Sequence, residues 1–183
     1  MKKAIIGAIV ILSLGMFGCS KGESNDINVM AVNKAEKVVK SEYVSRLKKT
    51  GESTAGNYEE GNEYNSRYAD SEIHEERIYG ADRDRYKDYV ESISTFRTED
   101  EEINKLHDKL IETSLDVYNM LDEIVSISIE HKEIMDKGDW TDNDEKRMGE
   151  IEEKQVVLED MIENQQEHVE NILGELGNIL GVN

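Results

Sequence analysis

The chain of 183 residues contains no proline and only one cysteine. Aromatic residues make up 6% of it, and 22 Lys and Arg stand against 41 Asp and Glu. The absence of proline removes the residue that most often breaks a helix. A single cysteine excludes a disulfide framework within the chain, so the fold must be held by packing alone. A highly charged composition with few aromatics and no proline predicts long helices.

The shortage of basic residues is uneven along the chain, whose formal charge is −19. Residues 27–50 carry six basic side chains against two acidic ones, whereas residues 51–183 are strongly acidic. An acidic body repels phosphates, so we expect no nucleic acid partner. It also repels anionic lipid and anionic wall polymers, which predicts a body that stands away from the membrane. Many of these acids are also expected simply to form solvated helix faces.

The first residues combine two lysines with an apolar run over residues 4–17. This run is shorter than the roughly 20 residues that a membrane-spanning helix needs, and it is typical of a secretory signal peptide. It ends in the residues MFGC at 16–19, which resemble the lipobox of bacterial lipoproteins. The resemblance implies cleavage between Gly18 and Cys19 and acyl chains such as palmitate on Cys19. The alternatives are a secreted protein with a free thiol and an uncleaved anchor.

The organisation expected at the start of the chain follows from this resemblance. Residues 1–18 form a cleaved signal peptide, and residues 19–26 form a polar tether next to the lipid. The lipid bilayer is then a partner through acylated Cys19, because two or more acyl chains anchor a protein durably. The expected location is the extracytoplasmic face of the cell membrane, or the outer membrane if the cell has two.

The next two segments differ in pattern. Apolar residues recur at threes and fours over residues 27–49, which predicts a basic amphipathic helix that ends before Gly51. Residues 50–80 are rich in Gly and Tyr without apolar periodicity, which predicts a loop or linker, with at most a short helix that ends near Gly80.

Three tyrosines in this loop are candidate binding residues: Tyr58, Tyr64 and Tyr68. Tyrosine mixed with Gly and Asn suits adaptable recognition of a wall polymer, a cation or a peptide. The alternative is that these tyrosines pack back onto the rest of the fold. The sequence leaves both possibilities open.

Residues 81–183 predict an acidic antiparallel coiled-coil hairpin with a turn near 137–141. Mostly apolar residues, with some polar ones among them, recur at alternating spacings of three and four along two seams. The first seam is Ile93, Phe96, Asp100, Ile103, His107, Leu110, Ser114, Val117, Leu121, Ile124, Ser128, His131 and Met135. The second seam is Met148, Ile151, Gln155, Leu158, Ile162, Gln165, Val169, Ile172, Leu176 and Ile179.

Local sequence signals indicate where the helices of the hairpin begin. Thr98 and Glu101 fit a capping box, which predicts a helix restart near residue 99, and Thr141 is the expected N-cap of the last helix. The turn predicts a register in which Ser114 faces Gln165 as a polar layer. A hairpin buries only one face of each helix, so helix 27–49 is expected to complete an elongated all-α three-helix bundle. A homodimer is the alternative way to cover that face.

Few residues indicate a catalytic, metal-binding or ligand-binding site. The acids of the turn, Asp136, Asp139, Asp142 and Asp144, are weak candidates for a calcium site, but they lack EF-hand spacing and more simply form a capped turn. We therefore expect no metal and no cofactor. Trp140 beside them is either a contact anchor or a staple of the turn.

Two of the four histidines, His107 and His131, fall on the first seam. Buried polar residues at such positions specify register. A more specific hypothesis is that the seam is sensitive to pH, because burial shifts the pKa of an imidazole.

No nucleophile elbow, phosphate loop, Cys-x-x-Cys or dinucleotide fingerprint is present, so the sequence predicts no enzyme. In outline the chain resembles the small helical surface lipoproteins of Gram-positive bacteria. The predicted function is a helical interaction or structural module at the cell envelope, with an envelope protein as partner. The alternatives are a binding module that uses the Tyr-rich segment and a protective surface-exclusion lipoprotein.

Overall fold

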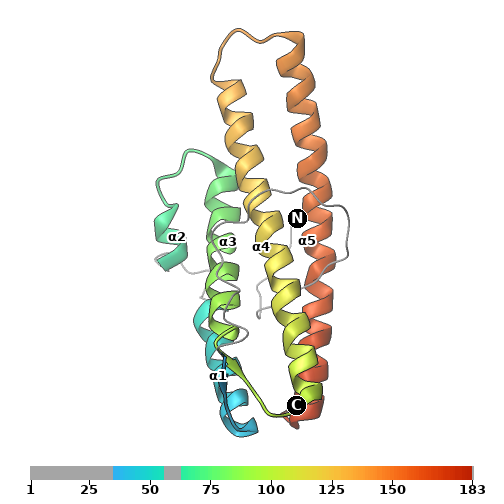
Figure 1. Ribbon diagram of the computed structural model, residues 1–183. Coiled ribbons are helices and arrows are strands. Elements are labelled where there is room, and N and C mark those ends of the chain that lie inside the picture. The colour runs from blue at the N-terminus through green and yellow to red at the C-terminus, as the bar shows by residue number, and fades with distance from the viewer. Residues whose placement is uncertain (1–34, 56–62, 183) are drawn as a thin grey trace, which may run out of the picture.

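The computed structural model describes residues 35–55 and 63–182. These residues form five helices and two very short strands, which confirms the all-α prediction (Figure 1). The elements in chain order are β1 (Glu36–Lys37), α1 (Lys40–Ala55), α2 (Glu63–Arg67), α3 (His74–Ile93), β2 (Phe96–Arg97), α4 (Glu101–Met135) and α5 (Asp142–Leu180).

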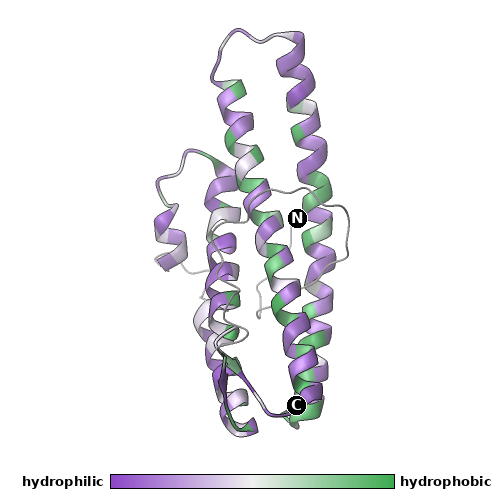
Figure 2. Cartoon of the chain, viewed as in Figure 1, coloured by the Kyte–Doolittle hydropathy of each residue, from purple (hydrophilic) through white to green (hydrophobic). Residues whose placement is uncertain are grey.

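The antiparallel hairpin is confirmed and consists of α4 and α5 (Figure 1). The first predicted seam is buried from Ile103 to Ser128, and the second is buried or half-buried throughout. Thr141 caps α5 as predicted, in a reciprocal capping box with Asp144. In Figure 2 the apolar residues follow the faces along which the two helices meet, and the outward faces are hydrophilic.

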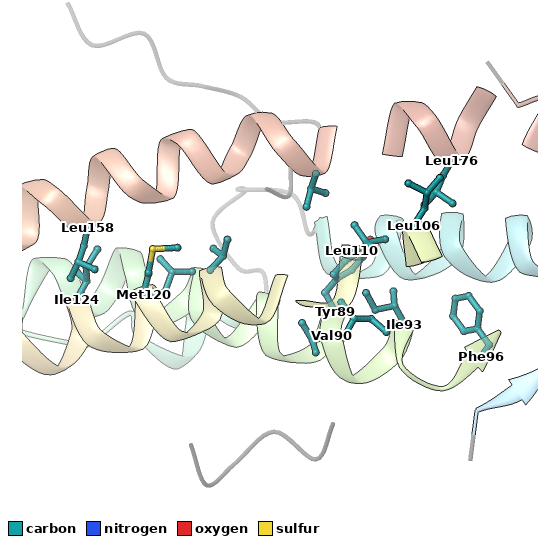
Figure 3. Packing of buried hydrophobic residues seen from close by; sticks show 14 of the residues in the cluster. Tyr89, Val90, Ile93, Phe96, Leu106, Leu110, Met120, Ile124, Leu158 and Leu176 are labelled. Atoms are coloured by element: carbon teal, nitrogen blue, oxygen red, sulfur yellow. The ribbon is translucent and has the colours of Figure 1, made fainter. Parts of the chain in front are cut away.

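The register of the hairpin agrees with the prediction to within one helical turn. Arg147 on α5 binds both carboxylate oxygens of Glu130 on α4, each at 2.7 Å. Figure 3 shows Leu158 of α5 beside Ile124 of α4. The expected polar layer of Ser114 and Gln165 is buried, but its two side chains do not bond to each other. The Ser114 hydroxyl instead donates to the Leu110 carbonyl oxygen at 2.7 Å.

The predicted N-terminal helix over 27–49 is wrong in its bounds. Residues 27–34 lie outside the described residues, Glu36 and Lys37 form β1, and α1 begins only at Lys40 and continues through Gly51. The cause is pairing with β2: the Glu36 amide donates to the Thr95 carbonyl oxygen at 2.9 Å. Helical periodicity cannot reveal this, because the partner strand lies far away in the sequence.

The predicted loop over 50–80 is also wrong, because it contains the end of α1, all of α2 and the start of α3. The third long member of the bundle is α3, which packs along α4 (Figure 1). The first seam therefore does not run unbroken from Ile93. The chain leaves the helix there, forms β2 and restarts with Asp100, not Thr98, as the N-cap of α4.

The helices are arranged so that α4 lies between α3 and α5, while α1 packs on α3. The far end of the hairpin extends beyond the other helices, and α1, the strands and the C-terminus gather at the opposite end (Figure 1). Within residues 35–55 and 63–182, every helix is too short or too polar to span a bilayer.

Candidate functional site

The distal tip, defined here as residues 135–148, is the part of the hairpin that projects furthest. It exposes two large apolar side chains, Met135 at 45% and Trp140 at 44%. Gly138 takes the left-handed conformation, with φ 75°, that turns the chain between the helices. The tip is therefore a defined turn that presents apolar contact atoms to solvent.

Ion pairs and caps hold the acidic residues of the distal tip. Lys137 lies 2.5 Å from Asp144, and Lys132 lies 2.7 Å from Asp136. The Lys137 ammonium first, and then the Thr141 hydroxyl, lower the pKa of Asp144 to about 2. Asp139 and Asp142, the other two calcium candidates, lie exposed at the turn.

These acids do not converge on a common centre. Across residues 35–55 and 63–182, no group of three or more His, Cys, Asp or Glu is placed to hold a metal ion. Their arrangement is that of a capped interhelical turn.

The predicted tyrosines that the structure describes point inward. Tyr64 is buried, and its hydroxyl donates to Asp88 at 2.6 Å. The Tyr68 hydroxyl donates to Asp84 at 3.1 Å and accepts from Arg83 at 2.8 Å. This is the arrangement expected if the tyrosines pack back onto the fold. Tyr58, like Gly18 and Cys19, lies outside the described residues.

His107 is buried where α1, α3 and α4 meet. Its Nε2 lies 2.8 Å from the Ile93 carbonyl oxygen, which can only accept, so Nε2 carries the proton. Nδ1 then accepts from the Tyr43 hydroxyl at 2.6 Å. Burial, followed by the charge of Arg97, lowers the pKa of His107 to about 4, so the imidazole is neutral in the fold at neutral pH.

The rings of Tyr43 and Phe96 pack around this imidazole, with centroids 5.3 and 5.4 Å from it. The seam pattern placed His107 in the core correctly but did not identify these partners. His131, the other seam histidine, is half-buried and lies 4.0 Å from Glu152.

An apolar groove of about 550 Å³ lies between α1 and the end of α5. α1 contributes Val44 and Leu47, and α5 contributes Leu173, Gly177 and Leu180. The sequence reasoning missed this groove. A signal was present, because apolar and small residues share one face of each segment at spacings of three and four, but nothing in the sequence places the two faces opposite each other.

The fold and the distal tip define the class of the molecule as an all-α protein built on a projecting antiparallel hairpin. Comparison with known proteins finds no matching family model, no matching curated protein and no matching solved structure.

Proposed function

We propose that this protein is a membrane-anchored extracytoplasmic lipoprotein that binds an envelope protein through its helical hairpin. The observation that carries the proposal is that the start of the described chain and the distal tip lie far apart in the molecule. The described chain begins at Ala35, beside the strands, and the exposed distal tip lies at the opposite end of the hairpin (Figure 1). An anchor at Cys19 would therefore leave the tip free to face outward.

The dimensions suit such a role. Helix α5 has 39 residues, so it is about 58 Å long at 1.5 Å per residue. Fifteen residues separate Cys19 from Ala35, and an extended chain of that length reaches about 50 Å. The acidic body supports the same orientation, because its charge opposes contact with an anionic membrane surface.

The distal tip has the properties of a small protein-binding surface. Trp and Met are enriched at protein interfaces, and a well-held Trp is a typical anchor. The capping box at Thr141 and the Lys137–Asp144 pair fix the turn before any partner arrives. Such preorganisation reduces the entropy lost on binding.

The alternative of a binding module built on the Tyr-rich segment receives less support. The hydroxyls of Tyr64 and Tyr68 are already engaged with Asp88, Asp84 and Arg83. Tyr58, the third candidate tyrosine, lies outside the described residues. The surface-exclusion alternative rests on location alone.

Covalent crosslinking on intact native cells, followed by mass spectrometry of what is recovered, tests the proposal. We expect one dominant protein partner with the wild type and a large loss of it in Trp140→Ala. A Cys19→Ser variant should fail to incorporate an alkyne-labelled fatty acid and should leave the membrane fraction. Recovery of wall fragments alone, or of nothing above the Cys19→Ser control, would reject the interaction role.

A further inference from the structure

The apolar groove is an open side of the helix bundle. α1 packs on α3, α3 on α4, and α4 on α5, but α1 and α5 do not close against each other along the groove. They are joined at its end, where the Lys40 ammonium donates to the Ile179 carbonyl oxygen at 2.6 Å. Apolar residues on both walls, among them Leu47 and Leu173, are therefore left without the packing that a closed four-helix bundle would supply.

A polar group lies in this apolar setting without a partner. Tyr89 of α3 lines the groove and is only 2% exposed. Its hydroxyl forms no hydrogen bond with any residue in the described ranges, whereas the hydroxyls of Tyr64 and Tyr79 donate to carboxylates. The hydroxyl keeps access to the groove, because it is not among the buried side-chain atoms without a partner, which in the described residues are Arg85 Nε and Gln165 Oε1. A ligand that accepts a hydrogen bond would satisfy it.

The charge at the groove is the opposite of that of the body. Lys48 lies on the lining, and with Tyr89 it supplies the only polar side chains of the lining among the described residues. Its ammonium pairs with Glu52 only loosely, at 3.7 Å and largely in solvent, and such exposed pairs hold weakly. Lys49 follows it on the outer surface of α1. Both polar groups of the lining are hydrogen-bond donors, which suits an anionic acceptor.

We propose that this groove binds one long-chain fatty acid, with its alkyl chain between α1 and α5 and its carboxylate held by Lys48 and Tyr89. The volume lies within the range of roughly 300–1,000 Å³ typical of small-molecule sites that are mostly apolar with a few polar groups. A peptide segment fits this site poorly, because its backbone N–H and C=O groups would meet an apolar lining that cannot satisfy them. The inference rests on the described residues and does not depend on an anchor at Cys19.

Titration of carboxyl-¹³C palmitate into the chain from Ser20 to Asn183, followed by NMR and equilibrium dialysis, tests the proposal. This chain holds every described residue. We expect saturable binding of one palmitate per chain. Hexadecanol, which has the same alkyl chain without the charge, should bind about tenfold more weakly.

Two matched pairs of variants identify the site. Gly177→Leu places a side chain in the groove and should abolish saturable binding, whereas Gly174→Leu, where an added Cβ meets nothing within 4 Å, should not. Both changes put a better helix former on α5, so neither is expected to weaken the helix. Lys48→Gln should weaken binding about tenfold, and its neighbour Lys49→Gln should not.

Tyr89→Phe separates a ligand contact from a structural role. It should weaken palmitate binding and leave the stability of the ligand-free chain unchanged or higher, because the Tyr89 hydroxyl makes no hydrogen bond with the described residues that would be lost. Absence of saturable binding, or equal binding by Gly177→Leu and the wild type, would overturn the proposal. Equal affinity for palmitate and hexadecanol would overturn the assignment of the carboxylate to Lys48.

Discussion

His107 should make the stability of the fold depend on pH in a defined window. Burial lowers its pKa from the ordinary 6.5 to about 4. Between these values the unfolded chain binds a proton that the folded chain does not, so the free energy of unfolding falls as the pH falls through 6.5. The loss levels off below about pH 4, where both states are protonated.

The magnitude follows from the size of the shift. A displacement of about 2.5 pKa units, at 1.36 kcal/mol each, corresponds to a total loss of about 3 kcal/mol. Most of it, about 2 kcal/mol, should already appear between pH 7 and pH 5. Protonation disrupts the bond from the Tyr43 hydroxyl, because a charged imidazole has no free acceptor at Nδ1.

The assay is urea denaturation at pH 7, 6 and 5 for the wild type and His107→Gln, compared as a difference. The difference is needed because the many acidic residues repel one another less as they become protonated, which raises stability and masks the effect in the wild type alone. His168→Gln, on the exposed surface of α5, controls for the loss of one imidazole. If the wild type and His107→Gln lose stability in parallel from pH 7 to pH 5, the reasoning is refuted.

Three further substitutions test the packing that positions the hairpin. Thr141→Ala removes the hydroxyl that accepts from the Asp144 amide and should lower the free energy of unfolding by about 1 kcal/mol, with Thr141→Ser restoring it in urea denaturation. Gly80→Ala would place a Cβ 2.7 Å from the ring of Tyr68; it should displace α2 and speed proteolysis near residue 67, and an unchanged cleavage rate would contradict the contact. Gln165→Met removes a buried Oε1 that has no partner in the structure and should raise stability by about 1 kcal/mol, measured as a higher urea midpoint; a lower midpoint would show that the amide is satisfied after all.

The hairpin could be predicted from the sequence because its signals are local and periodic. Alternating spacings of three and four mark both seams, and Thr141 follows a glycine-containing turn. Its two helices are also adjacent in the chain, so a short connection already implies antiparallel packing.

The other helices could not be predicted as well, because their decisive contacts are distant in sequence. Gly80 has the appearance of a helix stop, yet α3 runs through it. The ring of Tyr68 packs where a Cβ would lie, which accounts for a glycine at this position. Gly51 likewise lies within α1 and lines the groove. The helix is broken near residue 95 because that segment pairs with residues 36–38, which propensity alone does not reveal.

The candidate sites also differ in how far the sequence could predict them, because some depend on local signals and others on contacts between distant residues. Trp140 could be placed at the turn from sequence, and its exposure agrees with either a contact anchor or a loose staple. The inward bonds of Tyr64 and Tyr68 depend on Asp88 and Asp84 of α3, a helix whose full length the sequence did not indicate. The fatty-acid groove needs α1 and α5, whose facing residues lie more than a hundred positions apart.

Site-specific photo-crosslinking on intact cells tests the central claim most directly. A photoreactive residue at Asp139, exposed on the distal tip, is compared with one at Glu167, exposed on the body of α5. The account predicts that Asp139 captures one envelope protein and that Glu167 captures little of it. Capture of lipid from Asp139, or equal capture of the same protein from both positions, would contradict a hairpin that stands away from the membrane and binds its partner at the tip.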